Sequence, residues 1–311
     1  MSVKITGMPR RNAGPSTPDL AALLPSWELH LRAERKSPQT VKVYGDGVRA
    51  LLRWCAAEDR PAVLDRPTMT GFVAGLLDAG AEPATARSRH LAVRRFSAWL
   101  VEEGEQDTDE LLSVKPPKID SKVTPVLSDD ELRALIKACA GAEMWHRRDE
   151  ALVRFMVETG TRAGEVVAMG VGDVDLARGV AVVRRGKGGK GRTVPIGAQT
   201  VRAIDRYLRA RRAHRLADTG ALWLGDRGKT FTYDGLYKTL GERAAAAGIK
   251  GFHPHVLRHT AASRWLAAGG SEGGLMAVAG WSRRDMIDRY TRATSEARAA
   301  DEARGLGLGD L

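Results

Sequence analysis

The chain has 311 residues and a formal net charge of +11 at pH 7, which arises from 49 Lys and Arg against 38 Asp and Glu. This length allows two ordinary domains with separate cores, and the charge favours a polyanion such as nucleic acid as partner, although a merely soluble basic protein has the same balance. The composition argues against a disulfide scaffold, because only Cys55 and Cys139 occur, and against a membrane or secreted protein, because no long apolar run or signal segment is present.

The first half of the chain predicts a helical domain. Residues 1–18 are basic and rich in Gly, Pro and Ser, which is typical of a disordered tail. From 19 to 112 apolar residues recur at helical spacing; Ser37-Pro38 and Pro83 indicate helix starts, and Gly80 and Gly104 indicate helix ends. This pattern predicts an all-α bundle of roughly four helices.

Basic side chains occupy polar positions of these helices and of the segment that follows them. Next to DNA they would follow the phosphate backbone, whereas otherwise they form an ordinary solvated face. The segment 113–126 is basic and contains several prolines, which predicts a linker between two domains; with DNA as the partner, this linker would lie along it. The candidates for DNA contact are Arg35, Lys36, Lys42, Arg87, Arg94, Lys115 and Lys118.

Residues 127–311 predict a second domain. Ser128 is a typical N-cap, and acidic residues follow it in the first turn of a helix. Helical patterns cover 128–139, 148–159, 200–216, 233–247, 255–268 and 274–278, and two β segments, 180–184 and 192–196, flank a Gly-rich turn. We therefore expect this domain to be mainly α with a small antiparallel β-sheet.

Four short segments of this domain carry polar residues in a characteristic order. They are 159–166 with Arg162, 186–195 with Lys187, 253–260 with His255 and Arg258, and 279–290, which ends at a tyrosine. Together they resemble the tyrosine recombinase (phage integrase) family, closely over the second domain and in general layout over the first. The resemblance implies an all-α core-binding bundle followed by a mixed α/β catalytic domain, in a two-domain Cre- or Xer-like layout without an arm-binding domain.

Arg162 and Arg258 are the predicted clamps on the reacting phosphate. Displacing an alkoxide from a phosphodiester builds negative charge on the non-bridging oxygens, and a site without metal needs fixed cations to stabilise it. Guanidinium suits this task because it stays charged and donates bidentately to phosphate. Glu165, three residues after Arg162, is expected to hold that guanidinium in place. A surface arginine in a turn is the alternative for Arg162.

His255 stands three residues before Arg258 at a predicted helix start, so both should project from one face, where the imidazole donates to the phosphate. His259 is expected to face the interior as a structural histidine. The alternative is a metal site formed by His253, His255 and His259, but no carboxylate or Cys is obviously placed to complete it. We expect no metal and no cofactor.

Lys187 lies in the Gly-rich turn, where its flexible side chain can reach into a groove. The resemblance implies that it is the general acid, which protonates the leaving 5′ oxygen. Lys190 in the same turn is the alternative for this role and a further candidate DNA contact. A phosphate-binding P-loop is not predicted, because the turn lacks the Lys-Ser/Thr pattern and is followed by a strand.

Tyr290 is the predicted nucleophile. Its phosphodiester would conserve the energy of the broken DNA bond, so the step could reverse without ATP. Trp281 stands nine residues earlier, where the commoner family pattern has His and Cre-like members have Trp. Its indole N–H can donate to the phosphate but supplies no acid–base chemistry. A buried core Trp is the alternative.

The resemblance implies a site-specific DNA recombinase, an integrase of a phage or another mobile element, which acts through a 3′-phosphotyrosyl intermediate. The implied partners are double-stranded DNA with inverted-repeat core sites, a homotetramer on two duplexes that resolves a Holliday junction, and a directionality factor. Residues after Tyr290 are expected to dock on the neighbouring protomer. We expect a soluble protein in the cytoplasm of a bacterial host, at the nucleoid. The alternatives are a Xer-type resolver of chromosome or plasmid dimers, a type IB topoisomerase, and a repressor that binds DNA without cutting.

Overall fold

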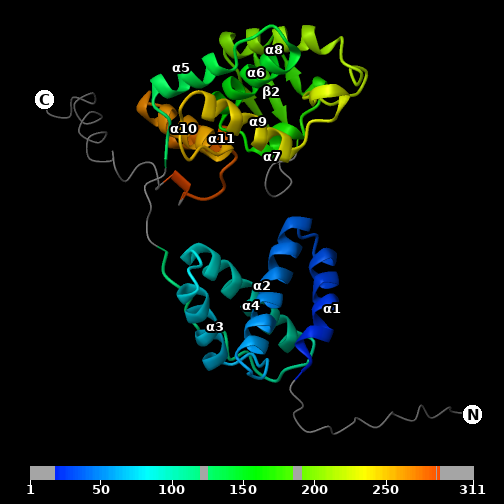
Figure 1. The fold of residues 1–311 in the computed structure, drawn as a ribbon, viewed down its shortest axis with the longest axis vertical. Coiled ribbons are helices and arrows are strands. Elements are labelled where there is room, and N and C mark those ends of the chain that lie inside the picture. The colour runs from blue at the N-terminus through cyan, green and yellow to red at the C-terminus, as the bar shows by residue number, and fades with distance from the viewer. Residues whose placement is uncertain (1–17, 120–124, 185–190, 285, 288–311) are drawn as a thin grey trace, which may run out of the picture. The chain divides into compact units, whose positions relative to one another are not determined.

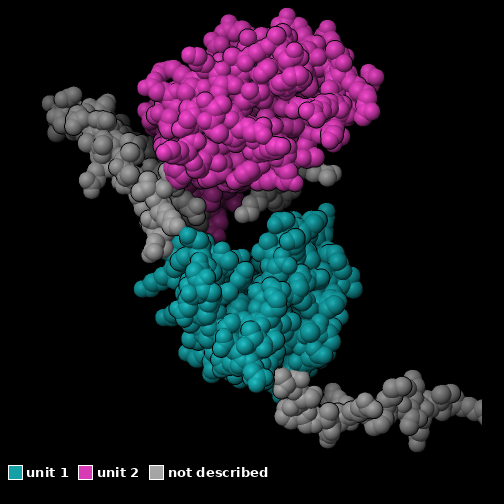
Figure 2. Space-filling model, in the orientation of Figure 1, with its two compact units in different colours: residues 1–122 teal, residues 123–311 magenta. Residues whose placement is uncertain are grey.

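The structure is a computed structural model that describes residues 18–119, 125–184, 191–284 and 286–287. Lys187, Lys190 and Tyr290 lie outside these ranges. The chain forms two compact units, residues 1–122 and 123–311 (Figure 2). The expected fold class, mainly α with a small antiparallel sheet, is confirmed, whereas the domain limits at 18, 112 and 126 stay predictions.

The first unit is a helical bundle whose described elements are α1 (Leu20–Ala33), α2 (Pro38–Ala57), α3 (Arg66–Asp78) and α4 (Pro83–Glu102) (Figure 1). Helix α2 begins where the sequence predicts, and Ser37 Oγ accepts the N–H of Thr40 at 3.1 Å. Gly80 and Gly104 follow the ends of α3 and α4 with φ of 79° and 75°, a left-handed conformation that glycine adopts without strain.

An aromatic cluster forms the centre of the first unit. Trp27 of α1 is only 1% exposed; its ring lies 5.0 Å from that of Phe96 of α4 and stacks on Tyr44 of α2 at 6.0 Å. Helix α2 also packs along α4. Each helix thus turns its apolar stripe inward, and most of its basic residues stay outside.

The second unit surrounds the central helix α6. Its described helices are α5 (Asp129–Ala138), α6 (Met144–Thr159), α7 (Ala163–Val167), α8 (Ala198–Arg211), α9 (Tyr233–Ala246), α10 (Pro254–Ala267) and α11 (Glu272–Ala279), with the short 3-10 turns η1 (Val171–Asp173) and η2 (Asp226–Gly228). Leu152, Phe155 and Met156 on α6 are almost completely buried, and α6 packs against α8 and α10 (Figure 1).

A three-stranded antiparallel sheet completes this unit, with β1 (Val174–Asp175), β2 (Val180–Val183) and β3 (Arg192–Pro195) in that order. Strands β2 and β3 pair from Val180 opposite Pro195 to Val183 opposite Arg192. The Gly-rich turn that the sequence predicts between these strands falls at residues 185–190, outside the described ranges.

Three elements differ from the sequence-based expectation. Helix α6 begins at Met144 rather than at 148, because its first turn is mostly polar and does not extend the apolar pattern. Helix α8 ends at Arg211 rather than at 216, and the Arg211 guanidinium donates to the carbonyls of Ala217, Thr219 and Ala221 in the segment that turns back. Strand β1 is too short to give a periodic signal. No helix in the described part of the chain is long and apolar enough to cross a membrane.

Candidate active site

Arg162 lies in the turn between α6 and α7. Helix α6 ends at Gly160, whose left-handed φ of 61° turns the chain sharply, and Arg162 then caps α7. Its Nη1 donates to Glu165 Oε1 at 2.9 Å, and its side chain is 23% exposed. Within the described ranges, Nε and Nη2 of Arg162 donate to no partner. These two nitrogens are therefore available to an anion at the surface of the second unit.

Glu165 is the acceptor around which two arginines gather. Its side chain is 5% exposed, and Oε2 also accepts the backbone N–H of Arg162 at 3.0 Å. Burial disfavours the carboxylate, but the hydrogen bonds from Arg192 and from Arg162 outweigh burial and lower the pKa of Glu165. The carboxylate is therefore ionised at neutral pH and orients the Arg162 guanidinium.

Arg192, the second of these arginines, is absent from the residues that the sequence singles out. It begins β3, and its Nη2 and Nη1 donate to the two Glu165 oxygens at 2.8 and 3.2 Å. Its Nε donates to the carbonyl of Val278 on α11 at 2.7 Å. The only sequence signal is that Arg192 shares the inward face of a short strand with the buried Val194, directly after the Gly-rich turn.

Arg258 on α10 links the ends of two other helices. It is 4% exposed; Nη1 donates to the carbonyl of Gly160 at the end of α6, and Nη2 to that of Ala279 at the end of α11, at 2.8 Å. Its guanidinium also lies over the Trp281 ring, 5.2 Å from the centroid. The structure thus brings Arg258 next to the turn that carries Arg162.

His255 is exposed at the start of α10, and its ring meets that of His259, which is half-buried, edge to face at 6.1 Å. Partial desolvation lowers the pKa of His255, and the charges of Arg258, His253 and Arg162 lower it further. His255 is therefore a neutral imidazole at pH 7 and close enough to both predicted clamps to feel their charge.

Trp281 follows α11 and is only 6% exposed. It packs with Ala262 and Leu266 of α10, Leu275 and Ala279 of α11, and Ile287. This environment supports the interpretation of Trp281 as a core residue that also contacts Arg258. Donation from its indole to a phosphate stays a prediction.

The metal alternative gains no support from the geometry. Across the described residues, no three His, Cys, Asp or Glu side chains gather closely enough to hold a metal ion, and this includes His253, His255 and His259. By contrast, Arg162 and Arg192 meet at Glu165, and Arg258 donates to Gly160, two residues before Arg162; these three arginines form the arginine cluster.

The DNA-contact candidates of the first unit are mostly solvent-exposed. Among them, Lys42 pairs with Asp46 on α2 at 3.0 Å, and Lys36 lies 3.6 Å from Glu34. Arg94 differs, because it is half-buried and donates to the carbonyl of Leu112 at 3.1 Å. Arg94 thus links α4 to the segment after it, and its contact with DNA stays a prediction.

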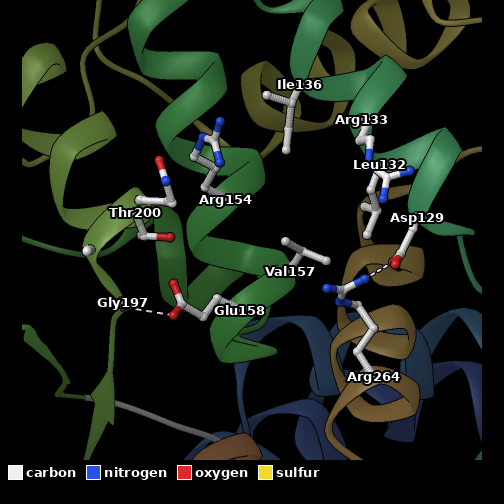
Figure 3. A pocket seen from close by; sticks show the side chains of 12 residues that line it. Asp129, Leu132, Arg133, Ile136, Arg154, Val157, Glu158, Gly197, Thr200 and Arg264 are labelled. Carbon is white, nitrogen blue, oxygen red and sulfur yellow. Dashed lines mark hydrogen bonds and ion pairs between the residues drawn. The ribbon is translucent and has the colours of Figure 1, made fainter. Parts of the chain in front are cut away.

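A cavity of about 450 Å³ lies elsewhere on the second unit, between α5, α6, α10 and the start of α8 (Figure 3). Leu132, Ile136 and Val157 supply its apolar lining. At its edge Arg264 pairs with Asp129, and the N–H of Gly197 donates to Glu158 at 2.7 Å (Figure 3). None of the predicted catalytic residues that the structure describes lines it, so Arg162, Arg192 and Arg258 lie outside this cavity.

Two family models match the chain. The model of the phage integrase family matches residues 125–297, which include all six predicted catalytic residues, and that of the phage integrase N-terminal SAM-like domain matches residues 24–104. The chain belongs to the phage integrase family. It is a tyrosine recombinase, a DNA-binding enzyme, as the four sequence segments imply.

Similar proteins carry Xer names. The chain is 31% identical over 248 residues to tyrosine recombinase XerD of Oceanobacillus iheyensis, which covers 77% of this chain and 82% of the relative. It is 29% identical over 292 residues to tyrosine recombinase XerC of Xanthomonas campestris pv. campestris, which covers 91% of this chain and 88% of the relative. These names place the recombinase with the Xer type.

Solved structures of recombinases share the fold of this chain. The crystal structure of XerA recombinase is 26% identical and covers 90% of this chain and 99% of its own, with a TM-score of 0.51. A XerH site-specific recombinase bound to a palindromic difH substrate shows the same fold, with a TM-score of 0.70 and 18% identity over 91% of this chain and 84% of its own.

Proposed function

We propose that this recombinase cuts and rejoins DNA at defined sites through a covalent 3′-phosphotyrosyl intermediate. The Tyr290 hydroxyl releases its proton to water and attacks the scissile phosphorus, a phosphotyrosyl bond forms, and the bond to the 5′ oxygen breaks. Lys187 supplies a proton to that oxygen, with Lys190 as the alternative donor. Attack by the 5′-hydroxyl of a partner strand then reverses the chemistry and releases Tyr290.

The observation that carries this proposal is the cluster of Arg162, Arg258 and neutral His255. Arg162 keeps two guanidinium nitrogens available, and Glu165 fixes the orientation of the group. Fixed cations of this kind stabilise the charge that develops on the non-bridging oxygens. Arg162 is partly exposed and His255 is exposed, so both can reach a phosphate of a bound duplex. The roles of Lys187 and Tyr290 rest on the sequence and on the span of the family match.

The working assembly we propose is a homotetramer that joins two duplexes with inverted-repeat core sites. In support, a solved relative of the same fold is described as a lambda integrase tetramer bound to a Holliday junction. The residues after Tyr290 lie outside the described ranges, and we propose that they dock on the neighbouring protomer. Deleting them from about residue 294 should impair pairing of two sites more than binding of one site, and equal loss of both would contradict docking.

The biological role has two candidates. The sequence alone favours integration and excision of a phage or mobile element, whereas the Xer names of the relatives favour resolution of chromosome or plasmid dimers. Deleting the gene separates them. Accumulation of unresolved dimers in dividing cells is the result expected of a resolver, and failure of one element to integrate or excise is the result expected of an integrase.

The chemistry is tested by covalent capture in EDTA. Wild-type protein and Tyr290→Phe are mixed with a fragmented DNA library and quenched with denaturant, and DNA that stays attached to protein is sequenced. We expect adducts with wild type only, which share one inverted-repeat core. Binding without any adduct would contradict the proposal and favour the repressor. Adducts without strand exchange between two sites would favour the topoisomerase.

A further inference from the structure

Glu165 poses an electrostatic problem for the site. A buried carboxylate in contact with Arg162 orients that guanidinium but also cancels its charge, and a neutral pair attracts a phosphate far less than a cation does. The other contacts of Glu165 show how the chain avoids this. Its two oxygens together accept four N–H groups, and two of these come from Arg192.

Arg192 is placed to balance Glu165 and not to bind substrate. Its side chain is 10% exposed, and Nε, Nη1 and Nη2 all donate to protein acceptors. Arg162, in contrast, is engaged by Glu165 through Nη1 alone and is more exposed. The three side chains of Arg162, Glu165 and Arg192 together carry one net positive charge. Arg162 is the most exposed of the three, so an anion meets this charge at Arg162.

Arg192 also joins three segments of the site. In the sequence it is the second residue after the Gly-rich segment 185–190, which contains Lys187. Its Nε donates to the carbonyl of Val278, and the carbonyl of the next residue, Ala279, accepts from Arg258. Gly280 follows with a left-handed φ of 64°, and a Cβ at this position would lie 3.0 Å from the Arg192 guanidinium. Because Gly280 has no Cβ, the Arg192 guanidinium fits against its backbone.

We propose that Arg192 is a positioning residue that neutralises Glu165 and thereby leaves the charge of Arg162 for the scissile phosphate. The inference deepens the proposed function and rests on it. It predicts that net charge in the trio governs anion affinity. Arg192→Met lowers that charge to zero, Glu165→Gln raises it to two, and the double variant returns it to one.

The experiment measures two properties of each variant. The first is the affinity for orthovanadate, a mimic of the phosphoryl transition state, measured by isothermal calorimetry on the full chain. The second is the single-turnover rate of adduct formation on the core-site duplex recovered by covalent capture. The matched control is Arg209→Met, which removes an arginine from α8 that pairs with Asp205 and is 59% exposed. Thermal denaturation shows which variants are folded.

We expect Arg192→Met to weaken vanadate binding and slow adduct formation about tenfold, as loss of one nearby charge at an effective dielectric constant of ~20 would do. Glu165→Gln with Arg192→Met should recover most of the affinity, and Arg209→Met should match wild type. Glu165→Gln alone should bind vanadate at least as tightly as wild type but react more slowly, because Arg162 loses its orienting carboxylate. Arg192→Lys keeps the charge and should retain affinity better than Arg192→Met.

A merely structural Arg192 gives a different pattern, in which the double variant is no better than Arg192→Met and Glu165→Gln loses affinity. That pattern overturns the inference while wild-type adducts keep the proposed function intact. If wild type forms no adduct, the proposed function fails, and the vanadate series alone decides whether Arg192 balances Glu165. If wild type binds no vanadate and forms no adduct, both the proposed function and the inference about Arg192 are contradicted. If Arg192→Met does not fold, the vanadate affinities of Glu165→Gln and Arg192→Lys still test whether Arg192 balances the charge of Glu165.

Discussion

Replacing Arg258 by Met should destabilise the second unit markedly. Arg258 is 4% exposed and donates to the carbonyls of Gly160 and Ala279, which belong to two different helices. Leaving a buried acceptor without its charged donor costs about 1.5–3 kcal/mol, and the two losses are not fully additive, so we expect about 3–5 kcal/mol. Loss of the contact with the Trp281 ring adds to this.

The assay is scanning calorimetry of the full chain. For a unit of this size each kcal/mol lowers Tm by roughly 2–4 °C, so the transition of the second unit should fall by about 10 °C while that of the first stays in place. Arg258→Lys, which retains the charge and can reach one carbonyl, should lose about half as much. The control is Arg264→Met on the same helix. The Arg264 side chain is 51% exposed in its pair with Asp129, so this substitution should lower the free energy of unfolding by less than ~1 kcal/mol. If the second unit unfolded at the same Tm in Arg258→Met and Arg264→Met, the stabilising role of the Arg258 hydrogen bonds would be refuted.

Three further predictions concern buried or shifted charges. Arg148→Met should destabilise the second unit by about 3–5 kcal/mol in urea, because Asp149, 1% exposed, loses one of its two arginine partners, and a loss under ~1 kcal/mol would contradict this. Folding lowers the pKa of Glu165, so the stabilisation by its carboxylate is complete above the ordinary pKa of 4.5 and is lost as pH falls through the lower folded pKa. The Tm difference between wild type and Glu165→Gln should therefore shrink in acid. A Tm difference that stays constant with pH would exclude this linkage. The pKa of His255, followed by NMR of its ring proton, should lie below 6.5 and rise in Arg162→Met, whereas an unchanged value would mean that the Arg162 charge does not reach the imidazole.

The sequence by itself determined the fold class, the family and the order of the polar residues. Helix periodicity, the Ser128 N-cap and the Gly-rich turn between two β segments are local features, and local features can be read from neighbouring residues. The spacing of Arg162, His255 and Arg258 indicated phosphate chemistry, because that chemistry needs these side-chain types. These patterns contained no information on which side chain faces which acceptor.

Only the tertiary structure decided how the cations are held. The contact of Arg192 with Glu165 joins residues 27 positions apart, and that of Arg258 with Gly160 joins residues 98 apart. Such contacts depend on how α6, β3, α10 and α11 pack, so no local pattern could separate the buried Arg192 from an ordinary basic residue beside a turn. Likewise the sequence marks Arg94 only as a basic residue on a helix, and the fold shows that it donates to the Leu112 carbonyl. Side-chain chemistry is local in sequence, whereas burial and partners are set by elements that meet only after folding.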